Sequence, residues 1–234
     1  LVLNSSKPVG NTPSLLNFDQ VSTLFHEFGH GLHGILTNCK YRSLSGTNVA
    51  RDFVELPSQI MENWACEPEV MKMYAKHYQT GEVIPDELIK KIEAAGTYGQ
   101  GFINTELIAA SLLDMDYHTI TTPTQIILPD FEDAAMAKIG LIPEIISRYK
   151  STYFKHIFSG GYSAGYYGYT WAAVLDSDAF QAFKETSLFD ATTAKSFREN
   201  ILEKGNTEDP MTLYVRFRGH EPSIEPLLTK RGLK

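Results

Sequence analysis

Residues 26–30 read His-Glu-Phe-Gly-His, an H-E-x-x-H motif inside a segment whose apolar residues recur at helical spacing. In an α-helix, His26 and His30 lie about 40° apart around the axis and one turn apart along it, so both imidazoles can reach one metal ion. Glu27 lies on the flank of this pair, where its carboxylate can act on a water without binding the metal. The motif predicts a zinc hydrolase in which His26 and His30 bind Zn²⁺ and Glu27 is the general base.

A catalytic zinc takes a third protein ligand and leaves a fourth position open. The metzincin extension of the motif is excluded, because the chain has His33 and Leu36 where that class has Gly and His. We expect His33 to be a surface residue or to contact one of the metal-binding residues, rather than to bind the metal itself. Downstream carboxylates remain as the third ligand, and residue logic leaves the choice among Asp52, Glu55 and Glu62 open. Asp52 and Glu55 also have the spacing of a helix capping box. In that role the Glu55 side chain would bind the backbone at the start of the helix instead of a metal.

A second candidate site is the segment 159–169, which is rich in glycine and tyrosine. Gly160 and Gly161 allow the backbone to approach a bound peptide closely or to adopt positive φ, so we expect them to bind substrate. The tyrosine hydroxyls can donate hydrogen bonds to a developing oxyanion without adding charge in the ground state. An aromatic core cluster with glycines for close packing explains the same composition, and the segment alone does not decide between the two.

The elements that carry these residues are expected to be helices. A helix should begin near Asn17, where Asn17 and Gln20 have the pattern of a capping box, and continue to about residue 36. Phe25, Phe28 and Leu32 predict that this helix is largely buried. Unpaired His and Glu side chains would be costly in such a helix, which favours a bound metal.

The rest of the chain also has mostly helical patterns, and the only expected strand is a short one near 40–44. The fold class is therefore mostly α. The further helices are expected at about residues 53–65, 68–78, 86–95, 98–118, 130–138, 170–185, 190–203, 208–217 and 223–230.

Composition excludes several classes of protein. Of the 234 residues, 43% are hydrophobic, enough for a substantial core, and 28 acidic against 21 basic residues give a net charge of -7, which argues against nucleic-acid partners. The longest apolar runs, such as 107–113, are too short to cross a membrane. Two cysteines are too few for a disulfide framework and fit a reducing compartment, so we expect a cytoplasmic protein with no nucleic-acid or membrane partner.

Two blocks of sequence together resemble a known family. Residues 26–30, 51–59 (Arg-Asp-Phe-Val-Glu-Leu-Pro-Ser-Gln) and 62–64 form the first block, and residues 154–169 form the second. They are similar to the oligopeptidase family of zinc metallopeptidases, which includes thimet oligopeptidase and neurolysin, and most similar to its bacterial peptidyl-dipeptidase (dipeptidyl carboxypeptidase) branch. The resemblance covers essentially the whole chain.

The resemblance implies a zincin-like metallopeptidase catalytic domain that is mostly α, with at most a short β element near 40–44. Because the family members are longer, we expect residues 1–234 to be the C-terminal catalytic part of a longer enzyme. Its zinc helices would span about 17–65, and its substrate loop and C-terminal helical part about 150–234. The missing N-terminal portion of the same polypeptide would form the other wall of the substrate channel.

The resemblance also implies roles for individual residues. Glu55 matches the third zinc ligand, beside one Zn²⁺ per chain. Tyr162 and Tyr169 match tyrosines that bind substrate and stabilise the oxyanion, and Tyr166 matches another tyrosine of the substrate loop. Animal members carry a histidine at the position of Ile157, and His156, one residue earlier, is the substrate-binding candidate here.

The function that follows is hydrolysis of short peptides, with release of dipeptides from the C-terminus. Two alternatives stay open: an endo-acting oligopeptidase of the same family, and a zinc-binding fragment without catalytic activity.

Overall fold

The computed structural model describes residues 1–234 and confirms a mostly helical chain. It divides into two compact units. Unit 1 combines Leu1–Tyr98 with Ala172–Lys234, and unit 2 is Gly99–Trp171. The tyrosine segment lies in unit 2, and the helices after Trp171 lie in unit 1. No helix is both long enough and apolar enough to span a lipid bilayer.

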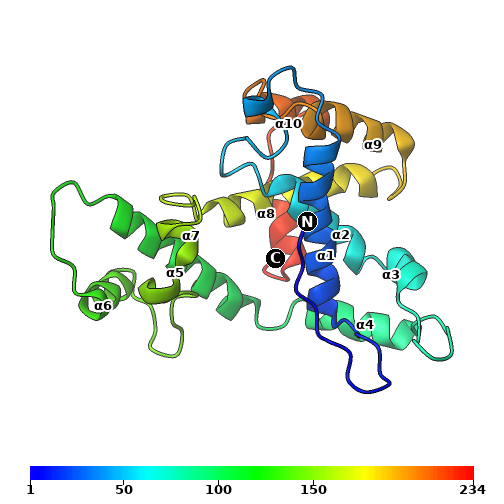
Figure 1. The fold of residues 1–234 in the computed structure, drawn as a ribbon, viewed down its shortest axis with the longest axis horizontal. Coiled ribbons are helices and arrows are strands. Elements are labelled where there is room, and N and C mark those ends of the chain that lie inside the picture. The colour runs from blue at the N-terminus through cyan, green and yellow to red at the C-terminus, as the bar shows by residue number, and fades with distance from the viewer. The chain divides into compact units, whose positions relative to one another are not determined.

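Unit 1 carries the predicted metal ligands, and Figure 1 shows α1 in blue and α2 in cyan. Its elements are α1 (Phe18–Ile35), the 3-10 turn η1 (Arg42–Leu44), α2 (Leu56–Cys66), α3 (Pro68–Tyr74), α4 (Asp86–Ala95), most of α8 (Gly168–Lys184), α9 (Ala191–Phe197), the π-helical turn η3 (Arg198–Leu202), α10 (Pro210–Arg218) and α11 (Glu225–Lys230).

Unit 2 carries the tyrosine segment. Its core combines residues of α5 with the chain around residue 154, including Leu113, Phe154 and Ile157. The sequence patterns did not predict the short helix within residues 154–158. The elements of unit 2 are α5 (Gln100–His118), α6 (Leu128–Lys138), the 3-10 turn η2 (Ser151–Tyr153) and α7 (Lys155–Phe158).

The predicted start of the first helix is confirmed. The backbone N–H of Gln20 donates to Asn17 Oδ1 at 2.9 Å, and the backbone N–H of Asn17 donates to Gln20 Oε1 at 3.0 Å. This reciprocal pair satisfies two N–H groups that have no partner within the helix, which stabilises the start of α1. The histidines of the motif therefore lie in the middle of a regular helix of 18 residues.

Two expectations about local structure were wrong. The strand near 40–44 is instead a 3-10 turn, in which Leu44 N–H donates to Tyr41 O and Ser45 N–H to Arg42 O. A strand needs a neighbour to pair with, and an isolated short segment satisfies its backbone more easily through such local bonds. The first helix is also not largely buried: Phe28 is 47% exposed, and the buried residues of α1 are Gly29 and His33.

The buried face of α1 packs on the start of α2 at Gly29. A Cβ atom added to Gly29 would lie 2.2 Å from the carbonyl oxygen of Pro57 and 2.6 Å from Ser58 Cα. These are backbone atoms, which cannot rotate away as a side chain can. Only glycine therefore allows the two helices to approach this closely, and the approach brings residue 55 beside the histidines.

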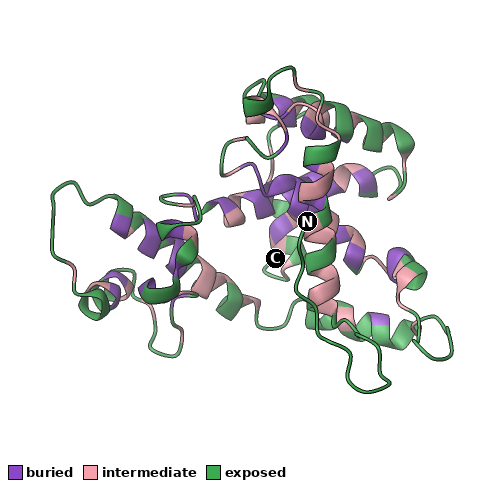
Figure 2. Cartoon of the chain, viewed as in Figure 1, coloured by how far each residue is buried: buried purple, intermediate pink, exposed green.

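The other side of α2 is anchored to α8, and Figure 2 shows buried residues concentrated in these two helices of unit 1. The indole of Trp64 packs edge-on against Phe180 and Phe183, with ring centroids 4.7 Å apart in both pairs. Asn63 Nδ2 donates to the buried carboxylate of Asp176 at 2.9 Å. Helix α2 is thus held between α1 and α8, which fixes the position of its first turn.

We expect Gly29→Ala to destabilise unit 1, because the new methyl group would overlap the backbone of α2. Overpacking of this kind costs about 1–3 kcal/mol, and thermal unfolding measures it as a lower Tm. Gly34→Ala is the matched control in the same helix, since a Cβ there meets nothing within 4 Å. The control should be neutral or stabilising by roughly 0.4–1 kcal/mol. Equal Tm values for the two variants would contradict the close approach.

Candidate metal centre

Three potential metal ligands converge in unit 1. One ligand atom each from His26, His30 and Glu55 lie within 4.8 Å of one another. Glu55 Oε2 lies 3.4 Å from His26 Nε2 and 3.1 Å from His30 Nε2. The two imidazole rings are nearly perpendicular, with centroids 5.0 Å apart. The structure therefore brings both histidines of the motif to the same carboxylate, which is 25 residues further along the chain than His30.

Glu55 occupies the position just before the first turn of α2, but its side chain does not cap that helix. Its carboxylate is almost completely buried, and Ser58 Oγ lies 2.9 Å from Glu55 Oε2. The capping-box interpretation of Asp52 and Glu55 would need a helix that starts three residues earlier than α2 does. The position of the helix start thus leaves the Glu55 carboxylate available to the histidines.

Glu62 was an alternative third ligand, and the structure places it on the far side of His26. His26 Nδ1 lies 2.6 Å from Glu62 Oε1, so Nδ1–H can donate to that carboxylate while Nε2 faces Glu55. Carboxylates commonly hold metal-binding imidazoles in this way and fix both their tautomer and their orientation. Glu62 lies seven residues, or about two helical turns, beyond Glu55, a spacing that could have suggested this role. Asp52 is not part of the cluster.

The electrostatics of the cluster favour positive charge. Burial alone would lower the pKa of His26, but the hydrogen bonds and charges of Glu55 and Glu62 outweigh burial and raise the pKa to about 10. His30 Nδ1 is buried without a hydrogen-bond partner. Two imidazole nitrogens and one carboxylate oxygen form the donor set of one class of catalytic zinc site. The residues therefore fit a zinc ion. Its positive charge would take the place of the proton that the two carboxylates otherwise stabilise on His26.

Two neighbours of the histidines lie outside the cluster. Glu27 is partly exposed and is not among the clustered ligands, and its role as general base remains a prediction. His33 is completely buried, so its expected surface position was wrong, and neither of its ring nitrogens has a hydrogen-bond partner. Burial, with a smaller effect from His30, lowers the pKa of His33 to about 4 and keeps its imidazole neutral. Its position follows from the packing face of α1, which it shares with Gly29.

The tyrosine segment forms an aromatic cluster in unit 2. The rings of Tyr162 and Tyr169 stack with centroids 5.1 Å apart and planes 17° apart. The His156 ring lies 6.2 Å from both and 5.5 Å from Tyr166. Tyr162, Tyr169 and His156 are partly buried, so they pack against the core without being enclosed by it. Their roles toward a substrate remain predictions.

Tyr166 differs from these residues because it belongs to the core of unit 2 and is 3% exposed. Burial raises the pKa of its phenol, and the neighbouring Tyr149 adds to the shift, whereas Arg148 opposes it. The packing interpretation therefore describes Tyr166 better than contact with substrate does. Ile157 is also completely buried in this core.

The glycines of the segment have two local functions. A Cβ at Gly160 would lie 2.8 Å from His156 Cα, so this glycine allows the chain to fold back on α7. Gly161 has a φ of +84°, a conformation that residues with a side chain rarely adopt. Both observations concern the loop itself, and binding of a peptide by Gly160 and Gly161 remains a prediction.

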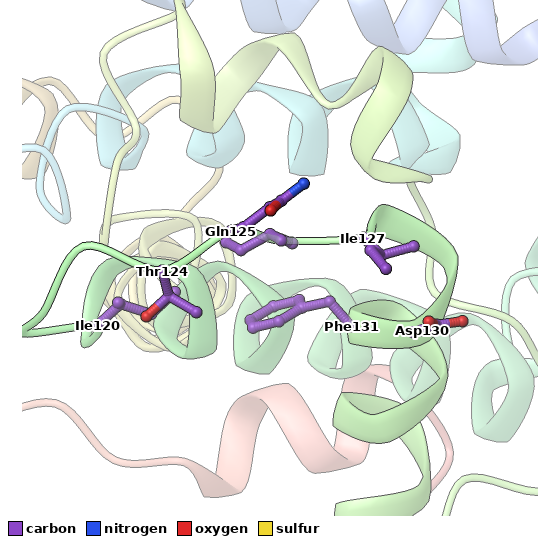
Figure 3. A pocket seen from close by; sticks show the side chains of 7 residues that line it. Ile120, Thr124, Gln125, Ile127, Asp130 and Phe131 are labelled. Carbon is purple, nitrogen blue, oxygen red and sulfur yellow. The ribbon is translucent and has the colours of Figure 1, made fainter.

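A separate groove in unit 2, drawn in Figure 3, contains none of the predicted site residues. It has a volume of about 410 Å³ and its surface is mainly apolar. Asp130 is its one ionisable residue, so the groove has no pair of groups for acid–base chemistry. The lining residues are Ile120, Thr124, Gln125, Ile126, Ile127, Asp130 and Phe131.

Comparison with known protein families gives a match over nearly the whole chain. The sequence model of peptidase family M3 matches residues 1–233. The chain belongs to peptidase family M3. This family membership confirms the resemblance that the two sequence blocks carried.

The similar relatives of this M3 family member are peptidases. It is 46% identical to a dipeptidyl carboxypeptidase of Salmonella typhimurium and 47% identical to one of Escherichia coli, each over 99% of the chain. It is 43% identical to oligopeptidase A of Escherichia coli over the whole chain. The matches cover 34%, 34% and 35% of these relatives, so the chain spans about a third of their length.

We expect Glu62→Gln to weaken zinc binding about 10–100-fold, because the amide no longer stabilises the His26 orientation by charge. Titration with zinc against a competing chelator measures the dissociation constant. Glu67→Gln is the control, since Glu67 follows the last residue of α2 and pairs with Lys184 at 2.8 Å. If both variants bound zinc as tightly as the wild type, Glu62 would not support the site.

Proposed function

We propose that this chain carries the catalytic centre of a zinc peptidase that hydrolyses short peptides, with His26, His30 and Glu55 as the zinc ligands. The convergence of their ligand atoms in unit 1 is the observation that carries the proposal. Membership of family M3 supports it. Zinc, when bound, supplies a Lewis acid that polarises a peptide carbonyl and makes water more acidic.

Each remaining step belongs to a residue of the chain. Glu27 takes a proton from the attacking water and delivers it to the amine that leaves, which suits a partly exposed carboxylate next to the ligands. Tyr169 and Tyr162 donate hydrogen bonds to the oxyanion that forms at the scissile carbonyl. We omit Tyr166 from substrate binding because its side chain is buried. His156, Gly160 and Gly161 remain candidates for substrate contact.

The mode of cleavage that we propose is release of dipeptides from the C-terminus of a peptide. The support is the similarity to dipeptidyl carboxypeptidases, whereas the similarity to oligopeptidase A supports internal cleavage. Mass spectrometry of a digested peptide distinguishes the two modes. Stepwise loss of dipeptides from a free C-terminus, abolished by C-terminal amidation, supports the first, and internal fragments support the second.

The active molecule is proposed to be the longer polypeptide of which this chain forms part, in the cytoplasm. The chain matches only about a third of the length of its relatives, which supports this proposal. The remaining part of the longer polypeptide would form the other wall of the substrate channel. Assays of residues 1–234 beside that polypeptide test the alternative of a silent fragment. Zinc binding in both, with hydrolysis only in the longer one, would identify the isolated chain as silent.

We expect Glu27→Gln to abolish most peptide hydrolysis and to leave one zinc per chain. The amide cannot accept the proton from water, and losses of a general base are typically about 10²–10⁴-fold in kcat. Metal analysis and kcat are measured on the same sample. Glu55→Ala is the comparison, and it should lose zinc as well as activity. Loss of zinc in Glu27→Gln would make Glu27 a ligand and contradict its role as base.

We expect Tyr169→Phe to lower kcat about 10²–10³-fold with little change in KM or zinc content, since the lost hydrogen bond forms mainly in the transition state. Tyr162→Phe should act in the same direction. Tyr98→Phe is the control, because Tyr98 is 85% exposed. Steady-state kinetics in the longer polypeptide measure the effect. A normal kcat in both the Tyr169 and the Tyr162 variants would leave these rings only a packing role.

A further inference from the structure

Asp114 of α5 is a completely buried carboxylate with an unusual set of partners. Its Oδ1 accepts the backbone N–H of Ala164 and its Oδ2 accepts the backbone N–H of Tyr166, both at 2.9 Å. His118, one turn further along α5, places Nδ1 2.7 Å from Oδ1. Burial of a carboxylate is costly unless its oxygens are fully hydrogen-bonded, and these three donors satisfy that need.

The two backbone partners of Asp114 lie inside the tyrosine loop, residues 160–168. Ala164 has a φ of +51° and is the one residue other than glycine with a positive φ in this structure. A residue with a Cβ avoids this conformation unless its surroundings hold it there. The bond from Ala164 N–H to Asp114 supplies such a constraint. Ala164 also lies within a turn that is closed by a hydrogen bond from Gly165 N–H to Tyr162 O.

The clamped residues stand between the two tyrosines of the proposed mechanism. Ala164 follows Tyr162 by two residues, and Tyr166 precedes Tyr169 by three. Tyr162 lies in the loop and Tyr169 follows it in the first turn of α8, where the two rings stack, so a shift of the loop backbone would change how the two hydroxyls lie relative to each other. Hydroxyls that stabilise a transition state must be held close to the productive position.

We propose that Asp114 is a positioning residue, which holds the tyrosine loop in the conformation that presents Tyr162 and Tyr169. It acts through the backbone of Ala164 and Tyr166 and does not touch substrate. The consequence for catalysis rests on the proposed function, whereas the clamp itself does not. A carboxylate is the side chain required, because each of its two oxygens accepts one backbone N–H.

Asp114→Asn tests the clamp, since the amide turns one of the two acceptors into a donor that faces an N–H group. Asp116→Asn is the matched control on the same helix, because Asp116 pairs with the exposed Lys138 at 2.7 Å and does not contact the loop. Two quantities are measured in the complete polypeptide that carries this chain. One is hydrogen exchange of the peptide that spans residues 160–168, and the other is kcat and KM for a short peptide.

The expected result for Asp114→Asn is exchange of the peptide that spans residues 160–168 about 10-fold faster or more, and a kcat lower by about 10–100-fold with KM and zinc content nearly unchanged. The control should match the wild type. Adding Ala164→Gly to Asp114→Asn should recover part of kcat, because glycine adopts positive φ without the clamp. A residue that only filled space in the core would not be rescued by that change.

Several outcomes would overturn the proposal. Asp114→Asn with the exchange and kcat of the control would do so, as would faster exchange throughout residues 99–171 without rescue by Ala164→Gly. If Asp114→Asn does not fold, His118→Ala decides by the same measurements, with a smaller effect in the same direction. If the wild type hydrolyses no peptide, the proposed function fails, and the exchange experiment still decides whether Asp114 holds the loop.

Discussion

The close approach of α1 to α2 at Gly29 is the constraint on which the candidate metal centre depends. The space available there admits no Cβ, because the carbonyl of Pro57 and the Cα of Ser58 fill it. The same approach carries Glu55, two residues before Pro57, to the Nε2 atoms of His26 and His30. A helix displaced by the width of a methyl group would separate the carboxylate from the imidazoles.

Around that contact, polar side chains from α2 and the residue before it surround the two histidines. Glu55 is buried against the histidines, Ser58 bonds to its oxygen, and Glu62 holds the outer nitrogen of His26. Each group alone would be costly in a partly buried place. Together they attract positive charge, as the raised pKa of His26 expresses, and a bound dication would meet the same attraction.

In unit 2, the tyrosines proposed to take part in catalysis are held in place in a different way. There the tyrosine rings pack on a hydrophobic core, while the loop that carries Tyr162 and leads to Tyr169 is tied by its backbone to a buried carboxylate. Packing restrains the rings, and hydrogen bonds restrain the backbone conformation, including the positive φ of Ala164. One segment can in this way serve both packing and chemistry, which explains why its composition alone did not distinguish them.

The sequence by itself determined the helical class, the capped start of α1, the pair of histidines one turn apart and the family resemblance, because these depend on local spacing. It could not choose among Asp52, Glu55 and Glu62 from spacing, since the choice depends on where α2 begins and how it lies against α1. It also predicted Phe28 to be buried, whereas the contact at Gly29 turns His33 inward and leaves Phe28 exposed. Hydrophobic periodicity identifies a helix, but the face that becomes buried is decided by the partner helix and by the one position where its backbone fits.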